Sequence, residues 1–218
     1  MELLHQSNII IHVISGTTAL LLGLIALLSL KGGKVHNRSG AYFLWLMAVV
    51  IMTGLMGVFV FGRNTFLLVI TVLSGYVAFS GMRALRAKSN QPQALDITVS
   101  LVSIGVLGYF LYYSQSIGIF WSPVVIYSGV SALLLVISYD LARYLIPTTT
   151  YQNRRLWLYE HIYKMTSAFS GLLAAFVGTV FDQYQPYSQT LPSALGVMII
   201  IGFMIYTGRY GLKKYRTS

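Results

Sequence analysis

The chain has 218 residues, of which 56% are hydrophobic and only 9% are charged, and its mean hydropathy is +0.70. Such a composition excludes an ordinary water-soluble domain, because too few polar side chains are present to cover a globule of this size. The net charge of +10 does not indicate nucleic-acid binding. The basic residues flank long apolar stretches, where membrane orientation and anionic lipid headgroups account for them. We therefore expect membrane lipids as partners and no nucleic acid.

Seven stretches are long and apolar enough to cross a bilayer as helices, since about 20 residues span a hydrocarbon core of about 30 Å. They are residues 7–30, 41–62, 65–87, 97–121, 123–145, 159–181 and 193–212. The links between them are too short for a second domain and make neighbouring helices antiparallel. The sequence predicts an all-α, seven-transmembrane-helix bundle that forms a single integral membrane domain over residues 1–218.

The distribution of basic residues predicts the orientation of this bundle. All but Arg63 of the 15 Lys and Arg residues follow the odd-numbered spans or begin the sixth. Because short basic loops stay on the cytoplasmic side, we expect the N-terminus outside and the C-terminus in the cytoplasm. The first residues lack the basic region of a signal peptide, so the first span should remain in the mature protein. The expected location is the bacterial cytoplasmic (inner) membrane, as a multi-pass protein.

The first span combines small residues with a histidine inside the membrane. Gly16, Ala19 and Gly23 follow one another at helical spacing and predict a face for close helix packing. His12 lies on the same side, so it should point at neighbouring helices rather than lipid. It is a candidate ligand or proton-relay residue. The alternative is a neutral histidine that hydrogen-bonds to a partner backbone group or to a hydroxyl, such as that of Ser15 or a nearby threonine.

Two acids near the cytoplasmic end are further candidates for a ligand or proton-relay site. Asp140 closes the fifth span and Glu160 begins the sixth. Each acid also has a basic residue of its own one turn away, Arg143 and Lys164 respectively. Local ion pairs at these spacings are therefore the competing structural interpretation.

His36 in the first basic loop and His161 beside Glu160 are candidates on the same face, and we consider them candidate metal ligands. If spans 2, 5 and 6 converge, these histidines could join Asp140 and Glu160 in a divalent-metal site of mixed nitrogen and oxygen ligands. A b-type haem is the other cofactor to consider, but it requires two histidines at similar depth on facing helices. The absence of cysteine rules out thiolate metal sites and disulfides.

The chain resembles a bacterial family of predicted multi-spanning membrane proteins classed only as a domain of unknown function. The resemblance rests on His12 with Gly16 and Gly23, on the loop from residue 36 to 40, and on His161 followed by Met165. The family more often has Arg directly after the loop histidine, where this chain has Asn37. The resemblance implies that the three histidines deserve testing, and it implies no activity.

The sequence favours a role in small-ligand binding or transport through a polar cavity between helices, bordered by spans 1, 2, 5 and 6. A haem- or metal-binding membrane redox protein is the alternative, and a structural or assembly partner is a third possibility. Catalytic residues are unknown, because no serine-hydrolase elbow, zinc-protease helix or phosphate-binding glycine loop is present. The sequence does not determine the oligomeric state or whether the protein is an enzyme.

Overall fold

The computed structural model describes residues 1–62, 66–117 and 123–211, and within these ranges the chain is helical. The long helices are α1 (Glu2–Leu28), α2 (Lys34–Phe59), α3 (Phe66–Ala87), α4 (Ala94–Ile117), α5 (Pro123–Ala142), α7 (Leu156–Val180) and α8 (Tyr187–Tyr206). The short elements are η1 (Arg143–Leu145), α6 (Thr148–Asn153), η2 (Asp182–Tyr184) and η3 (Thr207–Gly211). The expected all-helical architecture is therefore confirmed.

Six of the long helices are apolar and long enough to cross a membrane: α1, α2, α3, α4, α5 and α8. The remaining one, α7, has 25 residues, which corresponds to about 37 Å of helix. It differs from the others because it carries Glu160, Lys164 and several hydroxyl side chains. Protein surrounds this polar half of the helix, since no residue from Arg155 to Ala174 is exposed.

Several helices begin earlier than the sequence predicts. The first link is shorter than expected because Gly32, with φ of +75°, lets the chain reverse direction before Lys34 begins α2. His36 therefore lies in the first turn of a helix and not in a loop. The last helix also begins early, so that Pro192 lies inside α8 rather than before it.

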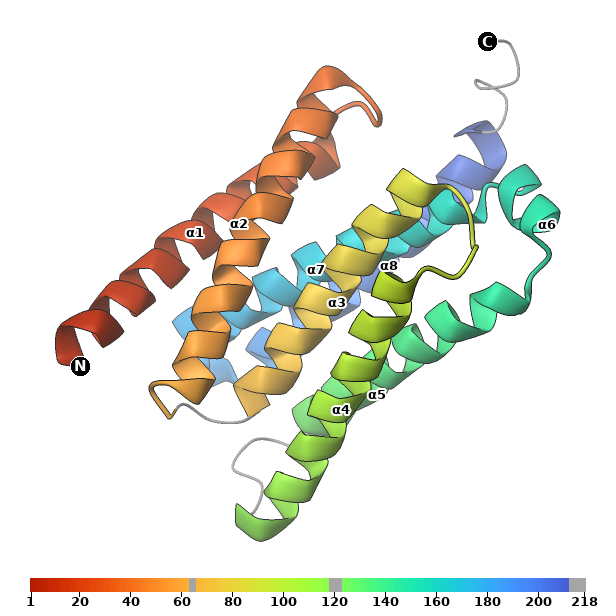
Figure 1. The fold of residues 1–218 in the computed structure, drawn as a ribbon. Coiled ribbons are helices and arrows are strands. Elements are labelled where there is room, and N and C mark those ends of the chain that lie inside the picture. The colour runs from red at the N-terminus through yellow and green to blue at the C-terminus, as the bar shows by residue number, and fades with distance from the viewer. Residues whose placement is uncertain (63–65, 118–122, 212–218) are drawn as a thin grey trace.

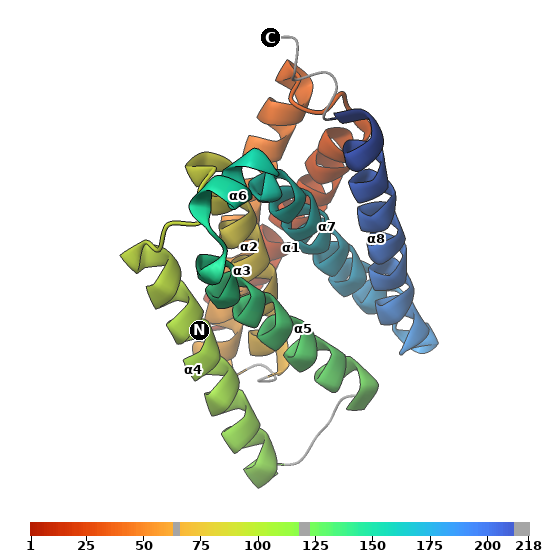
Figure 2. The same cartoon turned by 90° about the vertical axis from the view of Figure 1, so that its right-hand side faces the viewer.

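The helices form two outer hairpins around a central group (Figures 1 and 2). The α1–α2 hairpin lies on one side, and α4 with α5 lies on the other. Between them, α7 packs against α3 and α8. The N-terminus lies at the opposite end of the bundle from the α1–α2 and α3–α4 links (Figure 1). Neighbouring long helices are antiparallel, as the short links predict.

Glycines allow the helices to approach closely at several places, two of which involve α1 and α3. A Cβ atom on Gly23 of α1 would lie 2.6 Å from a ring carbon of Phe169 and 3.0 Å from one of Phe43. A Cβ atom on Gly81 of α3 would lie 2.8 Å from the Cβ of Lys164. Ala19, also on the predicted packing face of α1, is fully buried. The small residues of the first span therefore do form a packing face.

The outer surfaces of the helices are apolar. Only 17% of the most apolar stretch of α1 and 11% of that of α8 is buried inside the protein. Large side chains such as Ile14, Leu21, Met198 and Ile201 are exposed there. An apolar surface of this extent is far larger than water-soluble proteins expose, and lipid is the solvent that suits it. The chain has the features of a multi-pass membrane protein.

Candidate functional site: a buried cluster of four charges

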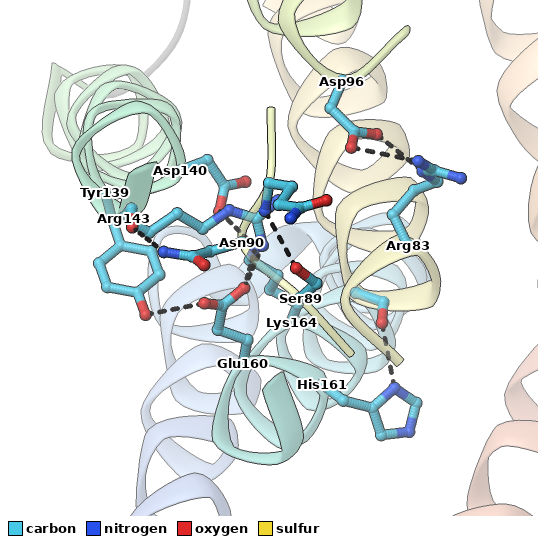
Figure 3. A network of polar contacts seen from close by, with 12 residues as sticks. Arg83, Ser89, Asn90, Asp96, Tyr139, Asp140, Arg143, Glu160, His161 and Lys164 are labelled. Carbon is cyan, nitrogen blue, oxygen red and sulfur yellow. Dashed lines mark hydrogen bonds and ion pairs between the residues drawn. The ribbon is translucent and has the colours of Figure 1, made fainter. Parts of the chain in front are cut away.

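Four ionisable side chains meet at one end of the bundle (Figure 3). Asp140 lies in the last turn of α5 and Arg143 begins η1, whereas Glu160 and Lys164 lie one turn apart on α7. Between 0% and 4% of each residue is exposed. We call these four residues the charged cluster. Two acids and two bases balance in charge, as the high cost of an isolated buried ion requires.

Ion pairs connect all four members of the charged cluster. Lys164 pairs with Asp140 and lies 3.3 Å from Oε2 of Glu160. A guanidinium nitrogen of Arg143 lies 2.5 Å from the same Glu160 oxygen, and its Nε lies 3.9 Å from Oδ1 of Asp140. The local pairs that the sequence predicts, at spacings of three and four residues, are confirmed. These local pairs belong to a larger network of ion pairs, which also joins α5 and η1 to α7.

Tyrosine hydroxyl groups also donate hydrogen bonds to the carboxylates of Asp140 and Glu160. Tyr76 of α3 donates a hydrogen bond of 2.9 Å to Asp140 and lies 3.0 Å from the hydroxyl of Ser100 on α4. Tyr139 donates a bond of 3.0 Å to Glu160. Four helices, α3, α4, α5 and α7, therefore contribute polar groups to one network. No pattern in the sequence indicates Tyr76 or Ser100, because isolated hydroxyl residues are common in membrane helices.

Two residues from connecting segments close the cluster. Asn90, in the α3–α4 link, donates hydrogen bonds to the carbonyl oxygens of Arg143 (2.8 Å) and Ile146 (2.6 Å). Tyr151 of α6 is fully buried. Burial, reinforced by the charge of Glu160, raises the pKa of Tyr151, so its hydroxyl remains protonated. The links between spans thus help to exclude water from the charged cluster.

The structure brings Asp140 and Glu160 together but places the histidines elsewhere. His161 points away from the charged cluster, toward α3, where its Nδ1 lies 3.1 Å from the carbonyl oxygen of Gly81 (Figure 3). The Nδ1 of His36 lies 2.9 Å from the carbonyl oxygen of Ala26 in α1. A carbonyl oxygen can only accept, so both rings donate from Nδ1. Their Nε2 atoms are the ones left able to act as acceptors or ligands.

His12 contacts a neighbouring helix, as its packing face predicts. Its Nδ1 lies 2.8 Å from Oγ1 of Thr53 in α2. The Thr53 hydroxyl donates to the carbonyl oxygen of Val49 at 2.8 Å, so it accepts from the imidazole. Asn8 donates to the Thr53 carbonyl oxygen on the same side of α1. The contact of His12 with the Thr53 hydroxyl therefore agrees with the alternative interpretation, in which the histidine hydrogen-bonds to a neighbouring group.

The structure does not form the mixed metal site that convergence of spans 2, 5 and 6 would produce. The carboxylates of Asp140 and Glu160 are occupied by Lys164 and Arg143, and His161 faces the other way. In the described parts of the chain, no three His, Asp or Glu side chains are grouped so as to hold a metal ion.

A small polar cavity adjoins the charged cluster. It lies between α3, α4, α5 and η1, and it has a volume of about 10 Å³. The sequence favours a polar cavity bordered by spans 1, 2, 5 and 6, whereas the observed cavity has different walls. The reason is that α1 and α2 form a separate hairpin, in which His12 and Thr53 contact each other.

Comparison with protein-family models, with curated proteins and with solved structures finds no match to this chain.

Proposed function

We propose that this protein binds or transports a small polar ligand in the membrane, and that the charged cluster with its adjoining cavity is the site. The supporting observation is the presence of four almost fully buried ionisable side chains within a bundle of membrane-crossing helices. Charged groups buried inside a membrane-helix bundle are costly, and in membrane proteins they typically mark ligand, ion or proton pathways.

Stability alone is a poor reason for such a network. Replacing a buried ion pair by apolar residues of similar volume is often neutral or stabilising, because desolvation offsets most of the attraction. In addition, within the described residues α5 packs mainly on α3 and α4 and has little backbone contact with α7. The charged side chains therefore fill the space between α5 and α7. A ligand carrying charges of its own can replace these pairs if the helices separate.

The proposal includes the orientation of the bundle. We propose seven spans, with α7 as the sixth and with the N-terminus outside, in the bacterial cytoplasmic membrane. The links and helix ends at the charged-cluster end carry nearly all basic residues, among them Lys34, Arg86 and Arg154. Arg63, Lys213, Lys214 and Arg216 lie outside the described residues. With this orientation the charged cluster faces the cytoplasmic side, and His12 lies nearer the outer side.

A thermal-stability screen of the purified protein in detergent tests this function. The probes are single amino acids, small amines, small carboxylic acids, phosphate, and sodium and potassium ions. Binding to the native state raises the free energy of unfolding by about 2.7 kcal/mol at 100 times the dissociation constant, so the melting temperature rises with ligand concentration. We expect at least one probe to do so, and the response to be unchanged in Asp182→Asn, an exposed acid outside the site. If no probe raises the melting temperature in a concentration-dependent way, the proposal is contradicted.

A metal- or haem-binding role is the second candidate, and the histidine hydrogen bonds favour it. Metal-binding histidines usually donate their other ring N–H to a carbonyl or carboxylate, as His36 and His161 do. This role predicts a Soret band or bound metal in the purified protein, lost in His36→Gln and His161→Gln. A colourless, metal-free protein that takes up no added zinc would contradict it.

A further inference from the structure

The cavity beside the charged cluster connects two polar regions that are otherwise separate. Part of its lining is Tyr76, Asp140 and Arg143 of the buried network. Another part is Arg83 near the end of α3 and Asp96 in the first turn of α4. A volume of about 10 Å³ is at the lower limit for one water molecule.

Two buried polar groups lining this cavity have no hydrogen-bond partner among the described atoms. They are the hydroxyl of Ser80 and Nε of Arg143. Ser80 is 6% exposed and Arg143 is 4% exposed. Leaving a buried donor unpaired is costly, and ordered water is the usual partner when protein atoms are too far away. A water bound in the cavity would give these two groups a partner.

The Arg83–Asp96 ion pair lines this cavity and is its partly exposed side. Nε of Arg83 is 2.7 Å from one oxygen of Asp96, and a terminal guanidinium nitrogen is 3.2 Å from the other (Figure 3). Gln93 also accepts from this guanidinium. The two charged side chains are 19% and 11% exposed, so they are partly hydrated, unlike the charged cluster behind them. Their position at the α3–α4 link is suited to a gate.

We propose that the cavity is a hydrated entry path from the α3–α4 side to Asp140, closed by the Arg83–Asp96 ion pair. This inference rests on the proposed function, because it specifies how water, protons or a small ligand reach the charged cluster. Tyr76 links the path to the cluster, since its hydroxyl contacts both Ser100 and Asp140. Breaking the gate pair should increase solvent access to the cavity without removing any member of the charged cluster.

The absence of cysteine makes this inference directly measurable. Ser80→Cys replaces a cavity-lining hydroxyl by a thiol of similar size, and its reaction with a small aminoethyl methanethiosulfonate is followed by mass spectrometry. The control is Ser103→Cys on α4, which is similarly buried, with 4% exposed, but is not part of the cavity lining. Both are examined alone and together with Asp96→Asn, and again with Arg83→Gln as an independent disruption of the gate.

The expected result is slow modification of the Ser80→Cys thiol while the gate pair is intact, and a rate about tenfold higher with either gate substitution. A factor of ten corresponds to about 1.4 kcal/mol in the opening equilibrium. The thiol of the Ser103→Cys control should remain slow throughout. Equal rates with and without the gate substitutions, or equal acceleration of the control thiol, would overturn the inference. Because no ligand is involved, such a failure is distinguishable from failure of the proposed function, which the stability screen tests separately.

Discussion

Lys164 of α7 forms an ion pair with Asp140 of α5, although these two helices have little direct backbone contact among the described residues. The lysine is completely buried, whereas its partner lies in the last turn of a helix that packs on α3 and α4. The pair therefore connects the α4–α5 side of the molecule to the central helices through side chains. Such a connection is strong only while both charges are present.

Removing one charge of this pair should be strongly destabilising. Lys164→Met leaves Asp140 buried without its main counter-ion, for which we expect a loss of about 3–5 kcal/mol in the free energy of unfolding. The measurement is a denaturant titration in mild detergent. The control, Lys34→Met, removes an exposed lysine and should change stability by less than about 0.5 kcal/mol.

The double variant Asp140→Asn with Lys164→Met should recover much of this loss. It removes both charges and leaves Glu160 paired with Arg143 and Tyr139. Asp140→Asn and Lys164→Met are also measured alone. If the stability loss of the double variant equals the sum of the two single losses, the two residues do not interact as described.

Close packing of α3 on α7 predicts a penalty for a single methyl group. In Gly81→Ala the new Cβ would lie 2.8 Å from the Cβ of Lys164 and 3.3 Å from the sulfur of Met165. Overpacking of this kind typically costs about 1–3 kcal/mol. Gly105→Ala on α4 is the matched control, since no atom lies within 4 Å of its new Cβ. It should be neutral or slightly stabilising, and equal melting temperatures for the two variants would contradict the described α3–α7 contact.

The hydrogen bond between His12 and Thr53 predicts a difference between two threonines of the α1–α2 hairpin. Thr53→Val leaves the imidazole without its acceptor, which should cost about 1–3 kcal/mol of unfolding free energy. Thr18→Val removes a hydroxyl that only contacts its own helix, at the carbonyl oxygen of Ile14. The same titration should show little change for Thr18→Val. A double-mutant cycle of Thr53→Val with His12→Leu measures the interaction free energy between His12 and Thr53. A value of zero would contradict the contact.

The orientation of the bundle can be mapped with single cysteines. Gln6→Cys near the N-terminus and Gln152→Cys in α6 both place a thiol at an exposed position. In intact cells, an impermeant maleimide should label the Gln6→Cys variant, and the Gln152→Cys variant should react only after the membrane is opened. The reverse pattern would contradict the proposed orientation, and labelling of both from outside would contradict an odd number of spans between the two positions.

The sequence predicts the class and helical content of this molecule well because apolar length is a local property. The pairs of Asp140 with Arg143 and of Glu160 with Lys164 were also predictable, since helical spacing alone brings them together. In contrast, Tyr76 and Ser100 join the cluster through tertiary packing of α3 and α4, for which one sequence has no signal. The same limitation applies to Thr53 as the partner of His12 and to the walls of the cavity.

A probe titration of a double variant shows whether the charged cluster is the ligand site. The probe that stabilises the parent protein is titrated into the Asp140→Asn, Lys164→Met double variant, with the melting temperature as readout. If the charged cluster binds the ligand, this variant folds but its melting temperature no longer responds to the probe. A concentration-dependent rise as large as that of the parent protein would contradict this assignment and would place the ligand elsewhere in the bundle.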